Sequence, residues 1–379
     1  MVLRASMSEQ PTILVNHLME PPGRITGITR FLFSLLEELV KRQQFQYVLA
    51  TTWPADQLPV ALARSELRVE TRPYCHSLPR NVMMQMATLP RLMREINAVA
   101  EFNCNPLGCF WPTWPRVMTV HDLYFDVVPQ YYRLRHRLWW KMFFPMALRA
   151  ATSVVCVSKS TQDDLRRFHP RHADKTVVVH EASCLRVPAE LVDVPDIEKG
   201  EPYALLVGNI SPNKNPACLV SALKILEQRG RPLTVLHVGR DEAELLAQSA
   251  SDAVLKHPIR RLGPLSDDAL AAAYSRAMFM VSASTHEGFC LPILEAQSCG
   301  TPVVCSDIPV LQEVAGDGAA FFDPSNPLML ADCIDRVRNE PDLLRELSEA
   351  GQRNAARFSW ARAAIETEEV LRAAIDGKQ

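Results

Sequence analysis

The sequence lacks any long apolar segment. No apolar run approaches the roughly 18 residues that are needed to span a bilayer. Near the N-terminus the only apolar stretch, Ile13–Val15, is interrupted on both sides by Pro11, His17 and Glu20. A secretory signal peptide needs an apolar core of about 7–15 residues, so a leader of this class is not expected. The sequence therefore predicts a protein that stays in the cytoplasm.

Paired cysteines are also missing. The chain has ten cysteines, but no two are spaced as C-x-x-C, and none forms a Cys/His cluster with the spacing of a zinc site. Several lie inside apolar runs, as Cys156 does in SVVCVS and Cys305 in PVVCSD. Such positions are typical of reduced thiols in a hydrophobic core. We expect neither a disulfide framework nor a structural metal.

Acidic residues are scarce in the first half of the chain only. Through Arg186 there are 23 Lys and Arg against 15 Asp and Glu, and the remainder has 18 against 28. A basic half can lie near an anionic partner, such as a membrane leaflet or a pyrophosphate. A chance bias in surface composition explains the same counts, so the asymmetry alone does not choose between these interpretations.

Strand-like and helix-like segments alternate along the chain. Apolar runs predict strands at Thr12–Val15, Tyr47–Thr51, Val117–Val120, Ser153–Val157 and Val177–His180, and the alternation restarts at Tyr203–Val207. A length of 379 residues suits two domains of roughly 150 residues each. Alternation of this kind is typical of parallel sheets covered by helices on both faces. We therefore expect an α/β protein with two Rossmann-like, doubly wound domains that face a central cleft.

The expected domain boundaries follow a change in composition. Residues 186–200 combine two prolines with mixed charges and no periodicity, as linkers do. They separate an N-terminal domain, residues 1–185, from a C-terminal domain, residues 201–360, and a C-terminal helix is expected over residues 361–379. In doubly wound sheets, ligands bind beyond the carboxyl ends of the strands. The loops that follow strands are therefore where site residues are expected.

The most informative segment is HEGFCLPILEAQSCGTPVVCSD, residues 286–307. Glu287 follows a predicted strand. Glu295 falls in the first turns of the next helix, where an ionised carboxylate can accept hydrogen bonds from both hydroxyls of a ribose. Between them, Phe289, Cys290 and Leu291 offer backbone N–H groups at a helix N-terminus, which suits a diphosphate. Two exposed glutamates around an ordinary loop would explain the spacing alone, but the whole string favours a nucleotide site.

Within this segment, EGFCLPILEA followed by CGTPVV closely resembles the signature of the family-four retaining glycosyltransferases, which have the GT-B fold. Other pieces match in the order of that family. In the second half they are GNISPNKNP, GPLSDDALAAAYSRA and IPVLQEVAGDGAAFFDP, and in the first half TGITRF, VHDLYFDVVP and VSKSTQDDL. The resemblance covers about residues 12–360 and is most specific in the second half.

The resemblance implies a role for each matching residue on the donor side. Lys214 would neutralise the diphosphate of a nucleotide-sugar donor, and a compact ammonium suits that charge. Glu287 would bind hydroxyls of the donor sugar, and Glu295 would hold the ribose. Gly263 and Pro264 would lie against the base.

The first half would complete the site. There His121 would contact the donor sugar and an acceptor group, and Gly27 would let the backbone approach a phosphate. Two positions depart from the family pattern, because Asn213 and Asn209 stand where arginines are common. Asn209 remains a predicted donor contact, but the diphosphate would depend more on Lys214 and on backbone amides.

The resemblance also implies an activity. The layout resembles bacterial mannosyltransferases of O-antigen or exopolysaccharide synthesis, which favours retaining transfer of mannose from GDP-mannose to a glycan or lipid-linked acceptor. There is no D-x-D triad, which is the usual metal site of the other glycosyltransferase fold. We therefore expect a nucleotide-sugar donor as substrate, no cofactor and no required metal. No nucleic-acid partner is expected. UDP-glucose remains an alternative donor, and a nucleotide-sugar 2-epimerase or an inactive binding subunit of the same fold remain alternative functions.

One further segment permits two interpretations. YYRLRHRLWWKMFFP, residues 131–145, is both basic and aromatic. It could lie peripherally against the inner face of the cell membrane, where a lipid-linked acceptor would be held. Alternatively, it is a packed helix with its arginines on the solvent face.

Overall fold

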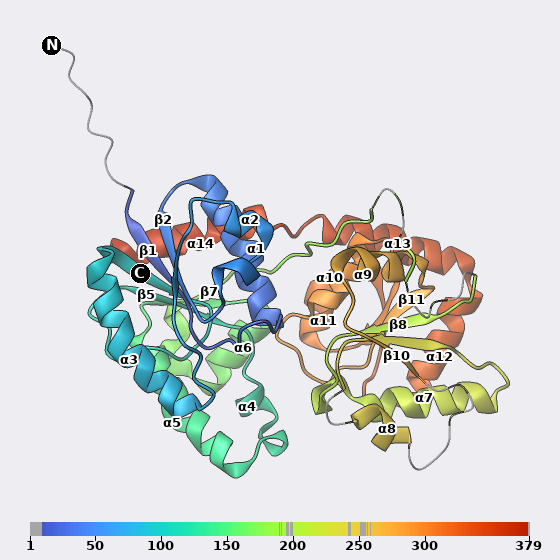
Figure 1. Ribbon diagram of the computed structural model, residues 1–379. Helices are drawn as coiled ribbons and strands as arrows, with labels where there is room; N and C mark the ends of the chain where they lie inside the picture. Colours follow the sequence, from blue (N-terminus) through green and yellow to red (C-terminus); the bar gives the residue numbers. More distant parts are fainter. Residues whose placement is uncertain are drawn as a thin grey trace. The chain divides into compact units, whose positions relative to one another are not determined.

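In the computed structural model (Figure 1), the structure describes residues 10–377 except 189, 191, 195, 196, 198, 199, 242, 243, 251–254, 256 and 258. The chain divides into two compact units. Unit 1 holds the residues up to Glu181 together with those from Trp360 onward, and unit 2 holds Ala182–Ser359. Each unit is built around its own parallel sheet.

Among the described residues, the sheet of unit 1 has seven strands in the order β3-β2-β1-β4-β5-β6-β7. All neighbouring strands run parallel. Apolar runs form these strands, and Ile13, Leu14 and Val15 in the first of them are fully buried. The strands are β1 (Thr12–His17), β2 (Gln46–Thr51), β3 (Arg68–Thr71), β4 (Ala98–Asn103), β5 (Arg116–Val120), β6 (Ser153–Cys156) and β7 (Thr176–Val178).

Two helices of unit 1, α1 and α6, begin at residues whose side chains accept a hydrogen bond from a backbone N–H group. Thr26 accepts a hydrogen bond from the N–H of Thr29, and Ser158 accepts one from Thr161, as N-cap residues do. The α-helices are α1 (Gly27–Arg42), α2 (Val60–Ala63), α3 (Leu78–Glu95), α4 (Tyr124–Val127), α5 (Leu134–Ala150), α6 (Lys159–Phe168) and α14 (Trp360–Ile375), and the short 3-10 turns are η1 (Ala55–Gln57), η2 (Pro129–Tyr131) and η3 (Pro170–Lys175).

The last helix, α14, returns to unit 1. It packs against α1 and against the central strands β4, β5 and β6. Leu371 on this helix is fully buried, and Glu368 accepts a 2.9 Å hydrogen bond from Nε of Arg42 on α1. The helix expected over residues 361–379 therefore belongs to the N-terminal unit.

Unit 2 has a similar design. Its sheet, as far as the chain is described, contains six parallel strands in the order β10-β9-β8-β11-β12-β13. The strands are β8 (Ala204–Val207), β9 (Val235–Val238), β10 (Arg260–Gly263), β11 (Phe279–Ser282), β12 (Val303–Ser306) and β13 (Ala319–Phe322). The helices are α7 (Pro216–Gln228), α8 (Leu245–Ala250), α9 (Asp267–Arg276), α10 (Leu291–Ser298), α11 (Pro309–Ala315), α12 (Pro327–Asn339) and α13 (Pro341–Ala355), with the 3-10 turns η4 (Pro212–Lys214) and η5 (Gly316–Gly318).

The expected fold class, two Rossmann-like α/β units, is confirmed. Three strands, β3, β4 and β10, were not anticipated from the sequence. The reason is clearest in β4, because it carries a buried charge. Glu101 is fully buried and accepts hydrogen bonds from Asn16 at 2.9 Å and from Trp114 at 3.0 Å. A carboxylate satisfied by distant partners is compatible with a central strand, although its local sequence is not strand-like.

The structural boundary between the units differs slightly from the expected one. It falls after Glu181 rather than after residue 185, and the expected linker 186–200 is grouped with unit 2. Residues 189, 191, 195, 196, 198 and 199 of that linker lie outside the described residues. Within the part of the chain that the structure describes, no helix is long and apolar enough to cross a membrane.

Candidate active site

In unit 2, the strand order reverses between β8 and β11. The chain adds β9 and β10 on one side of β8 and then crosses to place β11, β12 and β13 on the other side. At such a reversal the loops that follow the two central strands diverge, and the space between them is where doubly wound sheets bind ligands. Lys214 lies in the loop after β8, and Glu287 lies in the loop after β11.

Lys214 and Glu287 form an ion pair across this reversal. Nζ of Lys214 lies 2.5 Å from Oε1 of Glu287, and Oγ of Ser284 donates a 2.6 Å hydrogen bond to the same oxygen. Burial acts to lower the pKa of Lys214, but the charge of Glu287, the effect of Cys290 and the hydrogen bond to Glu287 together outweigh it, and the pKa is raised above its ordinary value. The ammonium is therefore charged at neutral pH, as a diphosphate ligand requires.

Asn213 fastens the two loops to each other. Its side-chain Nδ2 donates a hydrogen bond to the backbone carbonyl of His286 at 3.0 Å. Its backbone carbonyl accepts a hydrogen bond from the backbone N–H of Thr285 at 2.8 Å. An arginine at this position would have added a positive charge. The asparagine instead links the loop that contains Lys214 to the loop that contains Glu287 through hydrogen bonds. The sequence showed the departure at Asn213, but it gave no signal of this bridging role.

Helix α10 begins immediately beside the ion pair. Cys290 occupies its N-cap with φ of +78°, a left-handed conformation that a residue other than glycine adopts at a cost of about 1–3 kcal/mol. The N–H groups of the first turn are those that a helix leaves without intrahelical partners, and Leu291 opens this turn. Phe289, Cys290 and Leu291 are thus placed at a helix N-terminus, as predicted from the sequence.

The thiol of Cys290 is not a candidate nucleophile. Burial raises its pKa to about 12, and the charge of Glu287 acts in the same direction. At neutral pH the sulfur is therefore protonated, and a protonated thiol is a poor nucleophile. The backbone of this residue, and not its side chain, carries its predicted role.

Glu295 lies on α10 and is 5% exposed. Oη of Tyr274, from α9, donates a 3.2 Å hydrogen bond to Oε2 of Glu295 and is equally close to the carbonyl of Pro292. Burial, followed by the charge of Glu295, raises the pKa of Tyr274 well above its ordinary value, so the phenol remains a donor. Tyr274 thus fixes the orientation of the carboxylate, a contact between two helices that sequence motifs do not reveal.

The remaining donor-side residues follow neighbouring strands of the same sheet. Gly263 ends β10 with φ of +72°, and Pro264 follows it. Asn209 follows β8, and its side-chain oxygen accepts a 3.1 Å hydrogen bond from the N–H of Arg240, which follows β9. Because the strands are parallel, all the donor-side residues predicted from the sequence lie at or beyond one carboxyl edge of the sheet, or on the helix that starts there.

In unit 1, His121 follows β5, and each of its ring nitrogens lies close to an oxygen atom of the protein. Its Nδ1 lies 3.2 Å from Oε1 of Glu181, and its Nε2 lies 3.1 Å from the carbonyl oxygen of Cys104. The ring of Phe31 contacts the imidazole edge to face, with 4.9 Å between the centroids. A contact between His121 and a sugar therefore requires one of these partners to move. The sequence did not predict the Glu181 partner.

Gly27 is the first residue of α1, and a Cβ added there would meet no atom within 4 Å. Thr26, just before it, donates a 2.8 Å hydrogen bond to Oε2 of Glu20. The buried Glu20 also accepts from Asn105, which follows β4, at 3.3 Å. The strand order of unit 1 reverses between β1 and β4, so Glu20 joins the loops on the two sides of that reversal. Sequence reasoning had assigned no role to Glu20.

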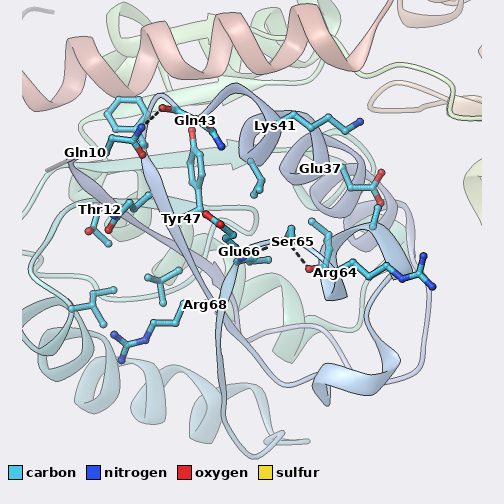
Figure 2. A pocket seen from close by; sticks show the side chains of 18 residues that line it. Gln10, Thr12, Glu37, Lys41, Gln43, Tyr47, Arg64, Ser65, Glu66 and Arg68 are labelled. Atoms are coloured by element: carbon cyan, nitrogen blue, oxygen red, sulfur yellow. Dashed lines mark hydrogen bonds between the residues drawn. The ribbon is translucent and has the colours of Figure 1, made fainter. Parts of the chain in front are cut away.

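A cavity of about 950 Å³ lies elsewhere in unit 1 (Figure 2). Its lining includes Thr12, Gln46 and Arg68, the first residues of β1, β2 and β3, so it opens at the amino ends of these strands. The ligand edge of a doubly wound sheet is the opposite one. None of the residues predicted for the site lines this cavity, and we do not assign it to the active site.

The geometry agrees with comparisons to known proteins. The family described as Glycosyltransferase Family 4 matches residues 25–182, and the family described as Glycosyl transferases group 1 matches residues 189–354. The O-antigen chain mannosyltransferase B of Escherichia coli is 31% identical over 264 residues, which cover 66% of this chain and 68% of that protein. This chain belongs to glycosyltransferase family 4. It is therefore a glycosyltransferase enzyme, as the sequence predicted.

Other similar proteins agree with this family. The O-antigen chain mannosyltransferase RfbU of Salmonella typhimurium is 28% identical over 232 residues, 60% of this chain and 62% of its own length. Sucrose-phosphate synthase from Thermosynechococcus elongatus aligns with a TM-score of 0.80 at 20% identity, over 97% of this chain and 100% of that one. The structure of Anabaena HepE in complex with UDP-glucose aligns with a TM-score of 0.72 at 18% identity, over 96% and 99% of the two chains. These solved structures support the GT-B fold of the glycosyltransferase.

The ion pair gives a direct prediction for Lys214. Replacing Lys214→Ala should lower turnover by more than about 100-fold, since losing a donor that stabilises developing charge costs roughly 3 kcal/mol. Steady-state sugar transfer measures the effect, with Lys224→Ala on α7 as the matched control and a thermal melt to verify folding. A folded Lys214→Ala enzyme with turnover within threefold of wild type would show that this loop is not the diphosphate site.

Proposed function

We propose that this glycosyltransferase transfers mannose, with retention of configuration, from GDP-mannose to a glycan or lipid-linked acceptor in polysaccharide synthesis. The observation that carries the proposal is the Lys214–Glu287 pair at the β8/β11 reversal, next to the N-terminus of α10. It offers one cation, one carboxylate and a row of N–H groups within adjacent loops. The choice of mannose is supported by the two relatives named as O-antigen chain mannosyltransferases. We also propose that the enzyme acts in the cytoplasm.

Lys214 has to exchange partners when the donor binds. In the free protein its ammonium is neutralised by Glu287 at 2.5 Å. A diphosphate at the start of α10 competes for that ammonium with more negative charge, and Glu287 is then released to accept hydrogen bonds from sugar hydroxyls. The pair thus presents two groups that are already positioned, so little reorganisation is needed when charge develops.

The proposed transfer needs no strong protein base. The bond between the anomeric carbon and the diphosphate oxygen breaks, and the acceptor oxygen bonds to that carbon from the same face. The acceptor proton passes to the departing diphosphate oxygen, so the products are the glycoside and the nucleoside diphosphate. Lys214 and the N–H groups of Phe289, Cys290 and Leu291 stabilise the charge on the leaving diphosphate. Glu295 holds the ribose, Gly263 and Pro264 lie against the base, and His121 contacts the donor sugar and the acceptor.

No metal or cofactor is needed in this mechanism. Over the described residues, no group of three or more His, Cys, Asp or Glu side chains is placed to hold a metal ion. We propose that Lys214 and the helix N-terminus supply the positive charge that a metal supplies in other nucleotide-sugar enzymes.

A donor screen in chelator tests the function. The purified enzyme should transfer mannose from GDP-mannose to a lipid-linked acceptor in excess EDTA, and it should use UDP-glucose more slowly. Product NMR should show the anomeric configuration of the donor. Preference for UDP-glucose would overturn the donor, inversion would overturn the retaining mechanism, and loss of activity in EDTA that returns with Mg²⁺ or Mn²⁺ would overturn the metal-independent mechanism.

The two glutamates should show different kinetic defects. Contacts of Glu295 with the ribose are remote from bond breaking and should be nearly equal in the ground and transition states, so Glu295→Gln should mainly raise the KM for the donor. Glu287 should contact the sugar whose charge changes during the reaction, so Glu287→Gln should mainly lower kcat. Steady-state kinetics of both variants decides the assignment. The same defect in both, or the reverse pattern, contradicts it.

A further inference from the structure

Strand β9 of unit 2 carries a histidine in an otherwise apolar run. His237 is fully buried, and its Nε2 lies 2.8 Å from the backbone carbonyl oxygen of Gly208, which follows β8. Among the described residues, Nδ1 of the same ring has no hydrogen-bond partner. A buried polar atom without a partner costs about 1–3 kcal/mol. The contact with Gly208 is therefore the polar contact that accounts for a histidine at this position.

This contact fixes which ring nitrogen of His237 carries the proton. Burial lowers the pKa of His237, so the imidazole is neutral at neutral pH and carries one proton. A carbonyl oxygen can only accept a hydrogen bond. The proton therefore lies on Nε2, and the side chain acts as a neutral donor from β9 to the loop that follows β8.

The peptide group between Gly208 and Asn209 is held on two further sides. Gly239 has φ of +137°, and a Cβ added there would lie 2.4 Å from the carbonyl oxygen of Gly208. The peptide therefore packs directly on the backbone of Gly239, which only a glycine permits. The side-chain oxygen of Asn209 accepts a 3.1 Å hydrogen bond from the N–H of Arg240. The end of β9 thus fixes both residues of this peptide.

The N–H of the same peptide points away from His237. The described residues contain no cis peptide bond, and in a planar trans peptide the C=O and N–H groups point in opposite directions. Asn209 is exposed, and within the described part of the chain its backbone N–H has no protein acceptor. It is therefore a donor that a ligand can use.

This peptide borders the ammonium of Lys214. A Cβ added to Gly208 would lie 3.9 Å from Nζ of Lys214, so a diphosphate held by that ammonium would lie beside the peptide. Asn209 and Asn213 stand where arginines are common in the family. Without those charges, backbone donors in this loop should make a larger share of the phosphate contacts.

We propose that His237 is a positioning residue for the donor diphosphate. It holds the carbonyl of Gly208 toward β9 and so presents the N–H of Asn209 to the phosphate beside Lys214. This role rests on the proposed function, because it requires a nucleotide-sugar donor at the β8/β11 reversal. Without the Nε2 donor, the peptide can turn its carbonyl oxygen toward the phosphate and repel it. His237 itself touches no atom of the donor.

Calorimetric binding of GDP and GMP to the intact protein tests the proposal, with UDP and UMP as a second pair. Replacing His237→Leu removes the donor but keeps a buried side chain. The preference for the diphosphate over the monophosphate should fall by about tenfold, the effect of one hydrogen bond to a charged group. His237→Gln restores an N–H donor at the end of the side chain, so its preference should stay within about threefold of wild type.

Val235→Ala is the matched control. Val235 is fully buried two residues earlier on β9, so its side chain lies on the same face of the sheet as that of His237. Its truncation should lower the melting temperature, as loss of core volume does, but it should leave the preference for the diphosphate unchanged. A purely structural role of His237 would make His237→Leu behave as Val235→Ala does.

NMR of the wild-type protein adds a measurement that does not depend on the folding of His237→Leu. With isotope-labelled asparagine, the backbone amide resonance of Asn209 should shift more with the better-bound diphosphate than with its monophosphate. The shift is expected because the second phosphate accepts a hydrogen bond from this N–H. The resonance is identified by its absence from an Asn209→Asp protein.

The outcomes separate the role of His237 from the proposed function. Diphosphate preference that is retained in folded His237→Leu, or lost equally in Val235→Ala, would overturn the positioning role and leave the donor site in place. So would an Asn209 amide that responds equally to diphosphate and monophosphate. Wild-type protein that prefers neither diphosphate to its monophosphate would overturn the donor site itself, and the role of His237 with it.

Discussion

The contact between Lys214 and Glu287 joins the two loops on which the proposed donor site of this enzyme depends. The ammonium and the carboxylate lie 2.5 Å apart, with side-chain exposures of 18% and 11%. Charges so far removed from water are costly unless each has a partner. Each group therefore holds the other in place, and Ser284 and Asn213 add hydrogen bonds that fix the surrounding backbone. The strand order of unit 2 places this pair at the reversal between β8 and β11, and α10 begins beside it. The topology of the sheet therefore determines where the proposed chemistry takes place.

Much of the fold could be predicted from the sequence, and so could the position of the proposed donor-site residues in it. Apolar runs located most strands, and EGFCLPILEA located Glu287, the start of α10 and Glu295, because these positions are set by local spacing. Strand β4 was missed because the partners of Glu101 come from Asn16 and Trp114. The return of α14 to unit 1 was also missed, since the contact of Arg42 with Glu368 links residues 326 positions apart. Asn213, Tyr274 and Glu181 act through the same kind of long-range contact.

The segment 131–145 shows the same limit in another form. Its composition indicated that it was basic and aromatic, and the packing of its aromatic rings agrees with the interpretation as a packed helix. Rings of α5 pack on Phe110 and Phe125, which lie outside this helix. This packing determines which residues of α5 face outward. Only the folded chain separates the partly buried Trp140 from the exposed Leu138.

The central claim is that Lys214 recognises the diphosphate of the donor. The most direct measurement is calorimetric binding of a nucleoside diphosphate and of the monophosphate of the same base, to wild type and to the Lys214→Ala variant. Wild type should prefer the diphosphate, and the variant should lose at least about tenfold of that preference, since hydrogen bonds to charged groups contribute about 1.5–3 kcal/mol. An unchanged preference in a folded Lys214→Ala protein would contradict the account.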